Sequence, residues 1–271
     1  MALYRLLSAD AIEMHIARKY TLFAHRVLPD RVYNRAFGLT RPIVRRQPDG
    51  VSSVALTFDD GPSPLTTPYI LRELARAGAR ATFFLSGVRV AAHPDLAAAI
   101  VAAGHAVYGH GWEHVDLEQA GPEAALAAAR RAEAVLSALR PTPDPYLMRF
   151  PYNAGHRRGW MHRAMTPFHP DIRFASWSFS TRDWLLAEEC ADLDAVAAKC
   201  AAKADEIGRL DDLPGSVVLL HENPFGAAGA LSASVARIFV PMVIERIQAR
   251  GLAMDAMRAE PARKETAWEA V

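Results

Sequence analysis

Short apolar segments alternate with longer alanine-rich segments from residue 51 to residue 250. The short segments are apolar at almost every position, which is typical of strands that are buried on both faces. We therefore expect strands at residues 51–58, 81–85, 105–108, 146–150, 172–178 and 216–221.

The segments between these strands carry the signals that begin and end helices. Pro68 lies in the first turn of one such segment and Gly78 follows its last residue, which is the usual placement of both residue types. Gly104 closes a second segment in the same way. We expect helices at residues 68–77, 94–103, 122–139, 193–207 and 234–250.

Regular alternation of strands and helices implies a parallel sheet, either open or closed into a barrel. The chain has 271 residues, which fits one large domain or two small ones. In parallel α/β folds the active site lies at the carboxyl ends of the strands. Chemically active residues that directly follow a predicted strand are therefore the first candidates for a functional site.

The composition excludes several classes of protein. Hydrophobic residues make up 51% of the chain and charged residues 23%, which is typical of a globular protein and excludes disorder over most of the length. The net charge of +1 excludes a strongly basic nucleic-acid binder. No uninterrupted apolar run approaches the ~18 residues that a membrane-spanning helix needs. Cys190 and Cys200 are too few for a disulfide framework, so we expect free thiols.

The first 50 residues differ in charge from the rest of the chain. They carry nine basic and four acidic residues, a net charge of +5, whereas the remainder carries −4. Apolar residues recur there at roughly helical spacing, so we expect a helical basic N-terminal arm (1–50), a catalytic domain (51–252) and a polar C-terminal tail (253–271). The arm either packs on the body or makes a peripheral contact with an anionic membrane surface or a lipid-linked substrate.

Two adjacent carboxylates, Asp59 and Asp60, follow the first predicted strand and precede Gly61 and Pro62. Like charges at this range are costly unless a positive group lies beside them, and a bound metal is the usual one. One carboxylate can then bind the metal while the other acts as a base. The same four residues are also suitable for a simple turn that ends the strand.

His110 and His114 follow the third predicted strand. Histidines at this spacing can bind one metal ion, and one Asp with two His leaves a coordination position open for water, as in catalytic sites. The segment also matches the H-x-x-E-H signature of a class of zinc proteases, in which Glu113 would lie over the metal on a helix and Glu188 or Glu189 would be the third ligand. The preceding strand, Gly109 and Gly111 argue against that helix.

Other predicted strand ends supply an arginine, a carboxylate and a histidine. They lie in Arg149-Phe150-Pro151-Tyr152, Asp183-Trp184 and Leu219-Leu220-His221. Each segment alone has an ordinary structural interpretation, and it is their shared position at strand ends that indicates a single site.

Taken together, these segments resemble the five ordered motifs of the polysaccharide deacetylases (carbohydrate esterase family four), over about residues 51–252. The resemblance implies an α/β fold of the distorted (β/α) barrel type. It also implies a divalent metal, usually Zn²⁺, and hydrolysis of an N-acyl group, most commonly acetyl, from an amino sugar.

The resemblance also implies a role for each matching residue. Asp60, His110 and His114 would hold the metal. The other catalytic residues would be the base Asp59, the acid His221, Arg149 to orient the base, the backbone N–H of Tyr152 to stabilise the oxyanion, and Asp183. The substrate-binding residues would be Pro151, with Trp184 and Leu219 as walls of the pocket for the acyl methyl group.

The sequence departs from the family pattern in its fourth motif, where Ser180 replaces the first Asp of D-x-x-D-W. That Asp resembles the usual partner of the acid histidine, and a carboxylate beside an imidazole raises its pKa. We therefore expect His221 to have a lower pKa than in typical relatives, unless Asp183 or Glu222 takes over. Glu222 itself stands where Asp is commoner, and residue 109 is Gly.

The segment 153–170 is rich in basic and aromatic residues. It is either a loop that recognises an anionic or phosphate-bearing sugar or simply a solvated basic loop.

These observations predict a metal-dependent N-deacetylase that acts on an N-acetylated amino sugar in an oligosaccharide or in a nucleotide- or lipid-linked precursor. Asp10 and Glu13 interrupt the apolar patch near the N-terminus, so we expect no secretory signal and a cytoplasmic location. That expectation counts against mature peptidoglycan or extracellular chitin as the substrate. The alternatives are a non-catalytic carbohydrate-binding member that lost turnover through Ser180, and a zinc protease.

Overall fold

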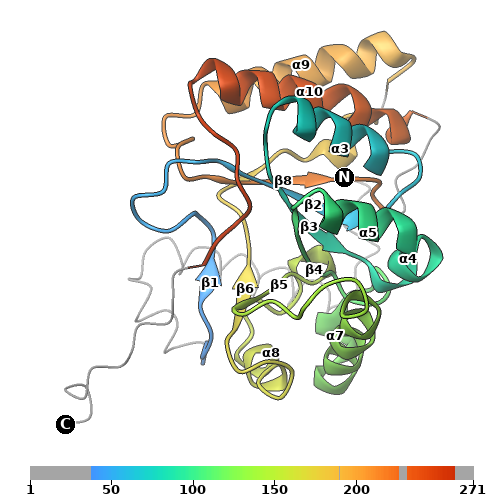
Figure 1. Ribbon diagram of the computed structural model, residues 1–271, viewed down its shortest axis with the longest axis vertical. Helices are drawn as coiled ribbons and strands as arrows, with labels where there is room; N and C mark the ends of the chain where they lie inside the picture. The colour runs from blue at the N-terminus through green and yellow to red at the C-terminus, as the bar shows by residue number, and fades with distance from the viewer. Residues whose placement is uncertain (1–37, 189, 226–230, 260–271) are drawn as a thin grey trace, which may run out of the picture.

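The computed structural model describes residues 38–259, apart from residue 189 and residues 226–230. Within these residues, eight strands form two sheets in which every neighbouring pair is parallel. The larger sheet has the order β4-β3-β2-β8-β7, with β2 (Ala55–Gly61), β3 (Thr82–Leu85), β4 (Ala106–Gly109), β7 (Phe179–Ser180) and β8 (Val217–His221). The smaller sheet has the order β1-β6-β5, with β1 (Ile43–Val44), β5 (Tyr146–Met148) and β6 (Ile172–Ala175). The predicted α/β fold, a distorted (β/α) barrel, is confirmed (Figure 1).

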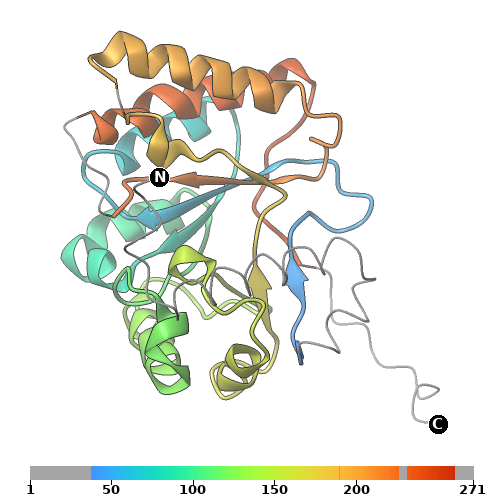
Figure 2. The same cartoon turned by 180° about the vertical axis from the view of Figure 1, so that it is seen from behind.

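Helices cover the outside of the two sheets (Figures 1 and 2). They are α3 (Thr67–Arg76), α4 (Gly87–Ala92), α5 (Pro94–Ala102), α6 (Leu117–Ala120), α7 (Pro122–Leu136), α8 (Gly159–Ala164), α9 (Leu193–Gly208) and α10 (Ser232–Ala249), with the short 3-10 helices η1 (Pro151–Asn153) and η2 (Asp183–Leu185). Each helix and strand predicted between residues 51 and 250 is present, and its ends lie within four residues of the predicted ones.

The sequence pattern missed the short elements β1, β7, α4, α6 and α8. None of them has more than six residues. Hydrophobic periodicity needs a longer window to separate a helix from a strand, so elements of this length leave no distinct signal.

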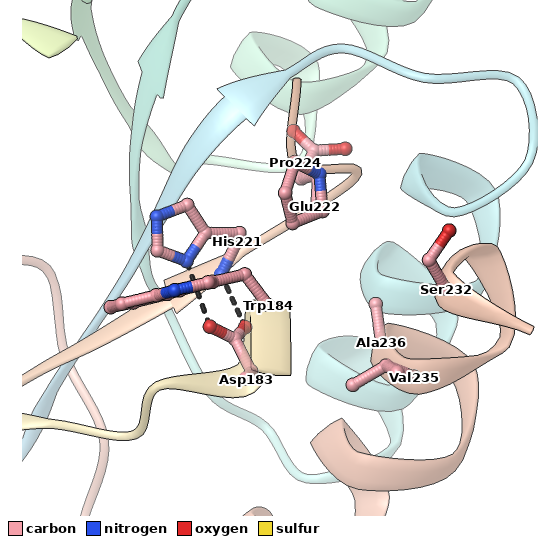
Figure 3. A pocket seen from close by; sticks show the side chains of 8 residues that line it. All are labelled: Asp183, Trp184, His221, Glu222, Pro224, Ser232, Val235 and Ala236. Atoms are coloured by element: carbon pink, nitrogen blue, oxygen red, sulfur yellow. Dashed lines mark hydrogen bonds and ion pairs between the residues drawn. The ribbon is translucent and has the colours of Figure 1, made fainter. Parts of the chain in front are cut away.

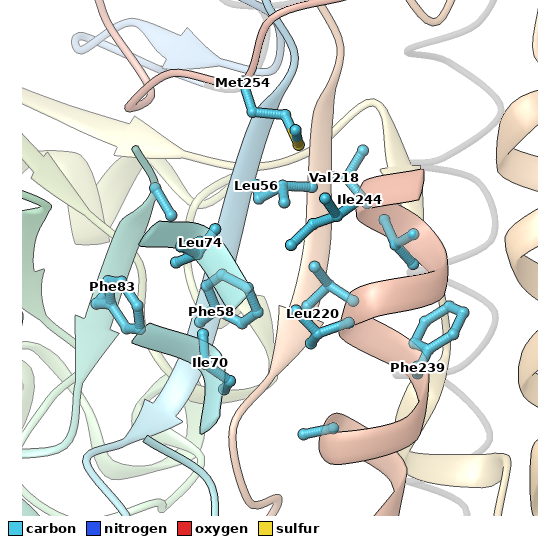
Figure 4. Packing of buried hydrophobic residues seen from close by; sticks show 14 of the residues in the cluster. Leu56, Phe58, Ile70, Leu74, Phe83, Val218, Leu220, Phe239, Ile244 and Met254 are labelled. Carbon is cyan, nitrogen blue, oxygen red and sulfur yellow. The ribbon is translucent and has the colours of Figure 1, made fainter. Parts of the chain in front are cut away.

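The main hydrophobic core fills the space between the larger sheet and the helices α3 and α10 (Figure 4). Phe58 on β2 stacks on Phe83 of β3 with ring centroids 5.1 Å apart, and both rings are fully buried. A second buried cluster lies around the smaller sheet and includes Tyr146 and Phe174. The two clusters fix the strands from both sides, so the residues at the strand ends are held on a rigid base.

The two ends of the catalytic domain differ from the prediction. The arm was expected to be helical through residue 50, but Ile43 and Val44 form β1, which pairs with β6. Met254 in the predicted tail forms a bridge with Val54, and the backbone N–H of Met257 donates to Thr82 Oγ1 at 2.8 Å. Residues 253–259 therefore pack against the sheet. The rest of the arm, its expected membrane contact and the rest of the tail lie outside the described residues.

Two further expectations concern the cysteines and membrane-spanning segments. Cys190 and Cys200 are free thiols, as predicted. Among the helices that the structure describes, none has the length and the apolar character that crossing a bilayer requires.

Candidate active site

The carboxyl ends of neighbouring strands bring the predicted site residues together. Asp59 at the end of β2 lies in register with His221 at the end of β8. His110 follows β4, and Arg149 follows β5 in the other sheet. The site is thus assembled at one edge of the barrel, where the parallel strands of both sheets end.

Asp60, His110 and His114 form the one cluster of potential metal ligands found among the described residues. Asp60 Oδ1 lies 3.5 Å from His110 Nε2 and 3.4 Å from His114 Nε2. Ligands about 2.1 Å from a tetrahedral metal ion are about 3.4 Å apart, so this spacing fits a divalent cation. Asp60 Oδ1 is also buried without a hydrogen-bond partner, which an ion at this position would supply.

Hydrogen bonding fixes the orientation of His110. Its Nδ1 lies 2.9 Å from the carbonyl oxygen of Arg149, and because a carbonyl can only accept, Nδ1 carries the proton. The lone pair of Nε2 therefore faces Asp60, as a metal ligand requires.

Asp59 is buried beside Arg149 and accepts a hydrogen bond from it, whereas Asp60 Oδ1 has no hydrogen-bond partner. Arg149 Nη1 donates to Asp59 Oδ1 at 2.8 Å. Burial opposes the charged form of Asp59, but Arg149, with contributions from His110 and His221, outweighs it and lowers the pKa of this carboxyl below its usual value. Asp59 is therefore ionised at neutral pH.

Arg149 is 1% exposed and is held by both sheets. It donates to Thr57 Oγ1 on β2 at 2.9 Å and to the carbonyl oxygen of Ser176, which follows β6, at 2.8 Å. Its guanidinium lies 4.1 Å above the ring of Phe84. These contacts hold the Arg149 side chain in one orientation. Because Arg149 donates to Asp59 Oδ1, the Asp59 carboxylate is held in place as well.

His221 pairs with Asp183, which is the exception that the expectation of a lower His221 pKa allowed for. Asp183 Oδ1 accepts from His221 Nδ1 at 2.8 Å, and Asp183 Oδ2 accepts from the His221 backbone N–H at 2.7 Å (Figure 3). Burial disfavours the imidazolium, but Asp183 outweighs burial and raises the pKa of His221 to about 9. Asp183 thus takes over the role expected to be missing because of Ser180, which is half-buried on β7.

Glu222 does not share this task. Its carboxylate points away from the His221–Asp183 pair (Figure 3), and it accepts a hydrogen bond from Thr67 Oγ1. Burial raises the pKa of Glu222 to about 8. The side chain fills the space over Gly61, where an added Cβ would lie 1.6 Å from Glu222 Oε1. A larger residue at position 61 would therefore clash with Glu222 and also with Leu85.

The backbone of Tyr152 adopts the left-handed conformation, with φ 57° and ψ 14°. This region is uncommon for residues other than Gly and Asn, and strain of this kind concentrates at functional sites. The preceding Pro151 is buried, and the exposed ring of Tyr152 meets the ring of His114 edge-on at a centroid distance of 4.5 Å. The turn that carries the predicted oxyanion donor therefore lies directly beside a predicted metal ligand.

A cavity of about 10 Å³ lies between His221, Trp184 and α10 (Figure 3). This is about the smallest cavity that can hold one water molecule. Trp184, which is predicted to form a wall of the acyl pocket, meets the ring of His221 edge-on at 5.0 Å. Leu219 is buried in β8 and is not among the residues that line this cavity.

Arg89 and Phe225 contact the predicted metal ligands, and no sequence pattern pointed to either residue. The ring of Phe225 stacks on His114 at 5.2 Å, and the guanidinium of Arg89 lies 3.6 Å above the ring of Phe225. Arg89 Nη1 also donates to the carbonyl oxygens of Asp60 and Asn223, each at 2.5 Å. Only the folded structure brings α4 and the loop after β8 together.

The structure removes the basis of the zinc-protease alternative. Residues 110–114 do not form a helix, and Glu113 is exposed. Glu188 is exposed as well, and residue 189 lies outside the described residues. The cluster of potential metal ligands therefore includes Asp60 and not the glutamates that a protease of this class would need.

Comparison with known proteins agrees with this geometry. Residues 46–163 match the family described as polysaccharide deacetylase. A chitooligosaccharide deacetylase from Rhizobium leguminosarum bv. trifolii is 35% identical over 172 residues, which cover 63% of this chain and 71% of that protein. A family 4 carbohydrate esterase from Streptomyces lividans, solved in complex with acetate, is 26% identical with a TM-score of 0.56, and the match covers 75% of this chain and 91% of that one.

A second similar structure is a CE4 family pseudoenzyme from Bacillus anthracis. It has a TM-score of 0.59 at 19% identity, and the match covers 80% of this chain and 68% of that one. At this level of identity the likeness shows the fold alone. The arrangement of the site residues, and not the barrel, must therefore carry the functional argument.

Proposed function

Because this chain belongs to the polysaccharide deacetylase family, we propose that it is a metal-dependent hydrolase that removes the N-acetyl group from an amino sugar in an oligosaccharide. The observation that carries the proposal is the placement of two distinct titratable pairs beside one potential metal site. Asp59 with Arg149 is held ionised, and His221 with Asp183 is held protonated, at the same edge of the barrel. Environments that push two groups in opposite directions are typical of a base and an acid.

Asp60, His110 and His114 would hold the metal. When bound, a divalent cation polarises the substrate carbonyl and acidifies water. Two imidazole nitrogens and one carboxylate oxygen form a donor set that suits Zn²⁺, so we propose zinc as the ion.

Asp59 would take a proton from the attacking water while the new carbon–oxygen bond forms. Its low pKa keeps it in the charged form that can accept the proton, and Arg149 prevents its carboxylate from rotating. A base that is aligned in this way contributes about 10²–10⁴-fold to the rate. The backbone N–H of Tyr152 would stabilise the oxyanion, which is worth about 10²–10³-fold.

His221 would donate a proton to the amine nitrogen as the carbon–nitrogen bond breaks, which releases acetate and the free amino sugar. Its raised pKa of about 9 keeps it protonated at neutral pH. This supply of a proton is essential, since an amide leaving group departs poorly as an anion. The alternative of a non-catalytic member rested on Ser180, and that support is lost because Asp183 provides the carboxylate.

The proposal is tested by acetate release from N-acetylglucosamine oligomers with zinc-loaded protein. We expect Asp59→Asn to lower kcat by about 10²–10⁴-fold, and chelation to abolish release until zinc is restored. The matched control is Glu113→Gln, an exposed acid in the same segment as the metal ligands, which should stay within about twofold. Full activity after Asp59→Asn, or loss of activity only with Glu113→Gln, would contradict the proposal.

A further inference from the structure

The two sheets meet where β4, an edge strand of the larger sheet, lies beside β5, an edge strand of the smaller one (Figure 1). The backbone N–H groups of Ala106 and His110 donate to β3, at 3.0 Å to Ala81 O and at 2.8 Å to Leu85 O. Residues of a strand direct their backbone groups alternately to its two sides. The odd-numbered positions of β4 therefore face β5, as the backbone groups of an edge strand do.

Side chains satisfy the backbone groups on this side of β4. Arg140, which follows α7, donates from Nε to the carbonyl oxygen of Val107 at 2.8 Å. The hydroxyl of Tyr146 on β5 accepts from the backbone N–H of Gly109 at 3.0 Å. Glu133 on α7 joins the two side chains: it accepts from both Nη atoms of Arg140, at 2.8 and 2.9 Å, and from the Tyr146 hydroxyl at 2.9 Å. We call Glu133, Arg140 and Tyr146 the junction cluster.

Charge fixes the direction of the hydrogen bonds in the junction cluster. Burial disfavours the charged form of Glu133, but its bonds to Arg140 outweigh burial and lower the pKa of this carboxyl below its usual value. Burial also raises the pKa of Tyr146, so its hydroxyl stays protonated at neutral pH. An ionised carboxylate can only accept, so the one proton of the hydroxyl is directed at Glu133. The lone pairs of the same oxygen are then free to accept from Gly109.

The close approach of Tyr146 depends on glycine at position 109. A Cβ added there would lie 3.2 Å from the Tyr146 hydroxyl oxygen and 3.5 Å from the Cβ of Ala132. The first distance is shorter than an ordinary van der Waals contact, so a side chain at position 109 would push the hydroxyl away from the backbone. Gly109, which departs from the family pattern, thus has a structural reason.

Gly109 directly precedes the predicted metal ligand His110. Two contacts therefore hold the end of β4 from the side of β5. The carbonyl of Arg149, which follows β5, fixes the ring of His110 through Nδ1 at 2.9 Å, and Tyr146 fixes the backbone that carries this ring. A site of this kind needs its residues within about 0.5 Å of the productive geometry, so a small shift of the β4 end would weaken it.

We propose that Tyr146 is a positioning residue for the metal ligand His110, and that Glu133 acts through Tyr146 by fixing the direction of its hydroxyl. The inference rests on the proposed function only for the metal that Asp60, His110 and His114 would hold. Hydrogen-bonding partners outside the ligand set contribute about 10–100-fold to metal affinity. The support of the metal site thus extends to α7, which none of the sequence motifs includes.

The test is the zinc affinity of the full chain, measured by chelator competition. Tyr146→Phe keeps the ring but leaves the Gly109 N–H without its acceptor, so we expect the zinc affinity to fall about tenfold. At saturating zinc, kcat for acetate release should fall several-fold while KM stays within about twofold. The matched control is Tyr108→Phe, which removes the hydroxyl of the neighbouring ring on β4 and should leave the zinc affinity within about twofold. Equal zinc affinities for Tyr146→Phe and the wild type would overturn the inference.

Two further variants separate positioning from a general loss of stability. Glu133→Gln should lower the zinc affinity several-fold, and adding it to Tyr146→Phe should lower the affinity no further, because Glu133 acts through the hydroxyl. Val243→Ala in the core below α10 lowers stability far from the junction cluster and should leave the zinc affinity of the folded protein unchanged. Equal losses of affinity in Val243→Ala and Tyr146→Phe would contradict positioning. If Tyr146→Phe did not fold, an unchanged affinity in Glu133→Gln would overturn the inference.

The zinc measurement requires no turnover, so it separates this inference from the proposed function. A chain that binds zinc, loses affinity in Tyr146→Phe and releases no acetate would support the inference and contradict the deacetylase. Acetate release with the same zinc affinity and kcat in the wild type and Tyr146→Phe would overturn the inference and leave the deacetylase intact. A wild-type chain that binds no zinc would overturn both.

Discussion

The metal-facing half of the site and the groove beside it, which is lined by Tyr152, Trp160 and Trp177 among others, are built in opposite ways. Asp60 and Arg149 are each 1% exposed, and each is fixed by neighbours on rigid strands. Tyr152 in the groove is 58% exposed, and the groove walls come from β1, the turn before α8 and the segment after β6. The metal-facing residues thus come from short motifs and are buried, whereas the groove is lined mostly by half-buried residues that only the fold brings together.

The largest expected effect is on the metal-facing side, at Arg149. Replacing it by Met leaves Asp59 buried without its partner, so we expect a loss of about 3–5 kcal/mol in the free energy of unfolding and a loss of activity of about 100-fold or more. Urea unfolding at pH 7 and acetate release measure the two effects. Gln119→Ala, at an exposed position of the groove wall, is the comparison and should change the stability by only about 0.5 kcal/mol or less.

The double variant Asp59→Asn/Arg149→Met sharpens this prediction. Because it removes both partners, it should be less destabilised than the sum of the two single variants. Strictly additive losses in the free energy of unfolding would contradict this prediction. A groove variant that is as unstable as Arg149→Met would show that the two regions do not differ in stability.

An intermediate effect is expected at the His221–Asp183 pair, where the measurement is the pH profile of kcat. A general acid must be protonated, so activity falls as pH rises through the pKa of His221, which Asp183 raises to about 9. In Asp183→Asn this alkaline limb should move to lower pH by about 1–3 units. Asp194→Asn, an exposed acid on α9, serves as the control and should leave the limb in place. An unmoved limb in Asp183→Asn would show that another group is the acid.

The smallest expected effect concerns the residues behind the metal ligands. Arg89→Met removes the hydrogen bond to the Asp60 carbonyl and the cation above Phe225, so metal affinity should fall about tenfold. A chelator competition assay measures this affinity without turnover. Arg72→Met, an exposed arginine on α3, should not change it. Equal affinities for the two variants would mean that Arg89 plays no part in positioning Asp60 and His114.

Sequence reasoning found the strands and the metal-facing residues for the same physical reason. A buried parallel strand is a nearly continuous apolar run, and the polar residue that ends it stands out, as Asp59 and His110 do. The pattern could also indicate that Asp183 was available to replace the missing Asp. It could not show that both oxygens of Asp183 would bind His221, because that contact joins η2 to β8 across 38 positions.

The parts that sequence reasoning missed depend on contacts between distant segments. Arg89 lies on α4, a helix of six residues with no periodic signal, and it reaches the site only because α4 follows β3 at the strand ends. Arg45 was assigned to the basic arm, yet the strand β1 places it in the groove wall. A local pattern contains no information of this kind.

Arg149 has a consequence for how the molecule fails under stress. Its side chain joins the β2 end of the larger sheet to the segment after β6 of the smaller sheet, and its carbonyl holds His110. A separation of the two sheets by little more than the length of a hydrogen bond would therefore disorient the base and a metal ligand while both hydrophobic clusters stay packed. Enzymatic turnover therefore reports whether the two sheets remain in contact. Under mild denaturation, turnover should be lost before the helical content decreases.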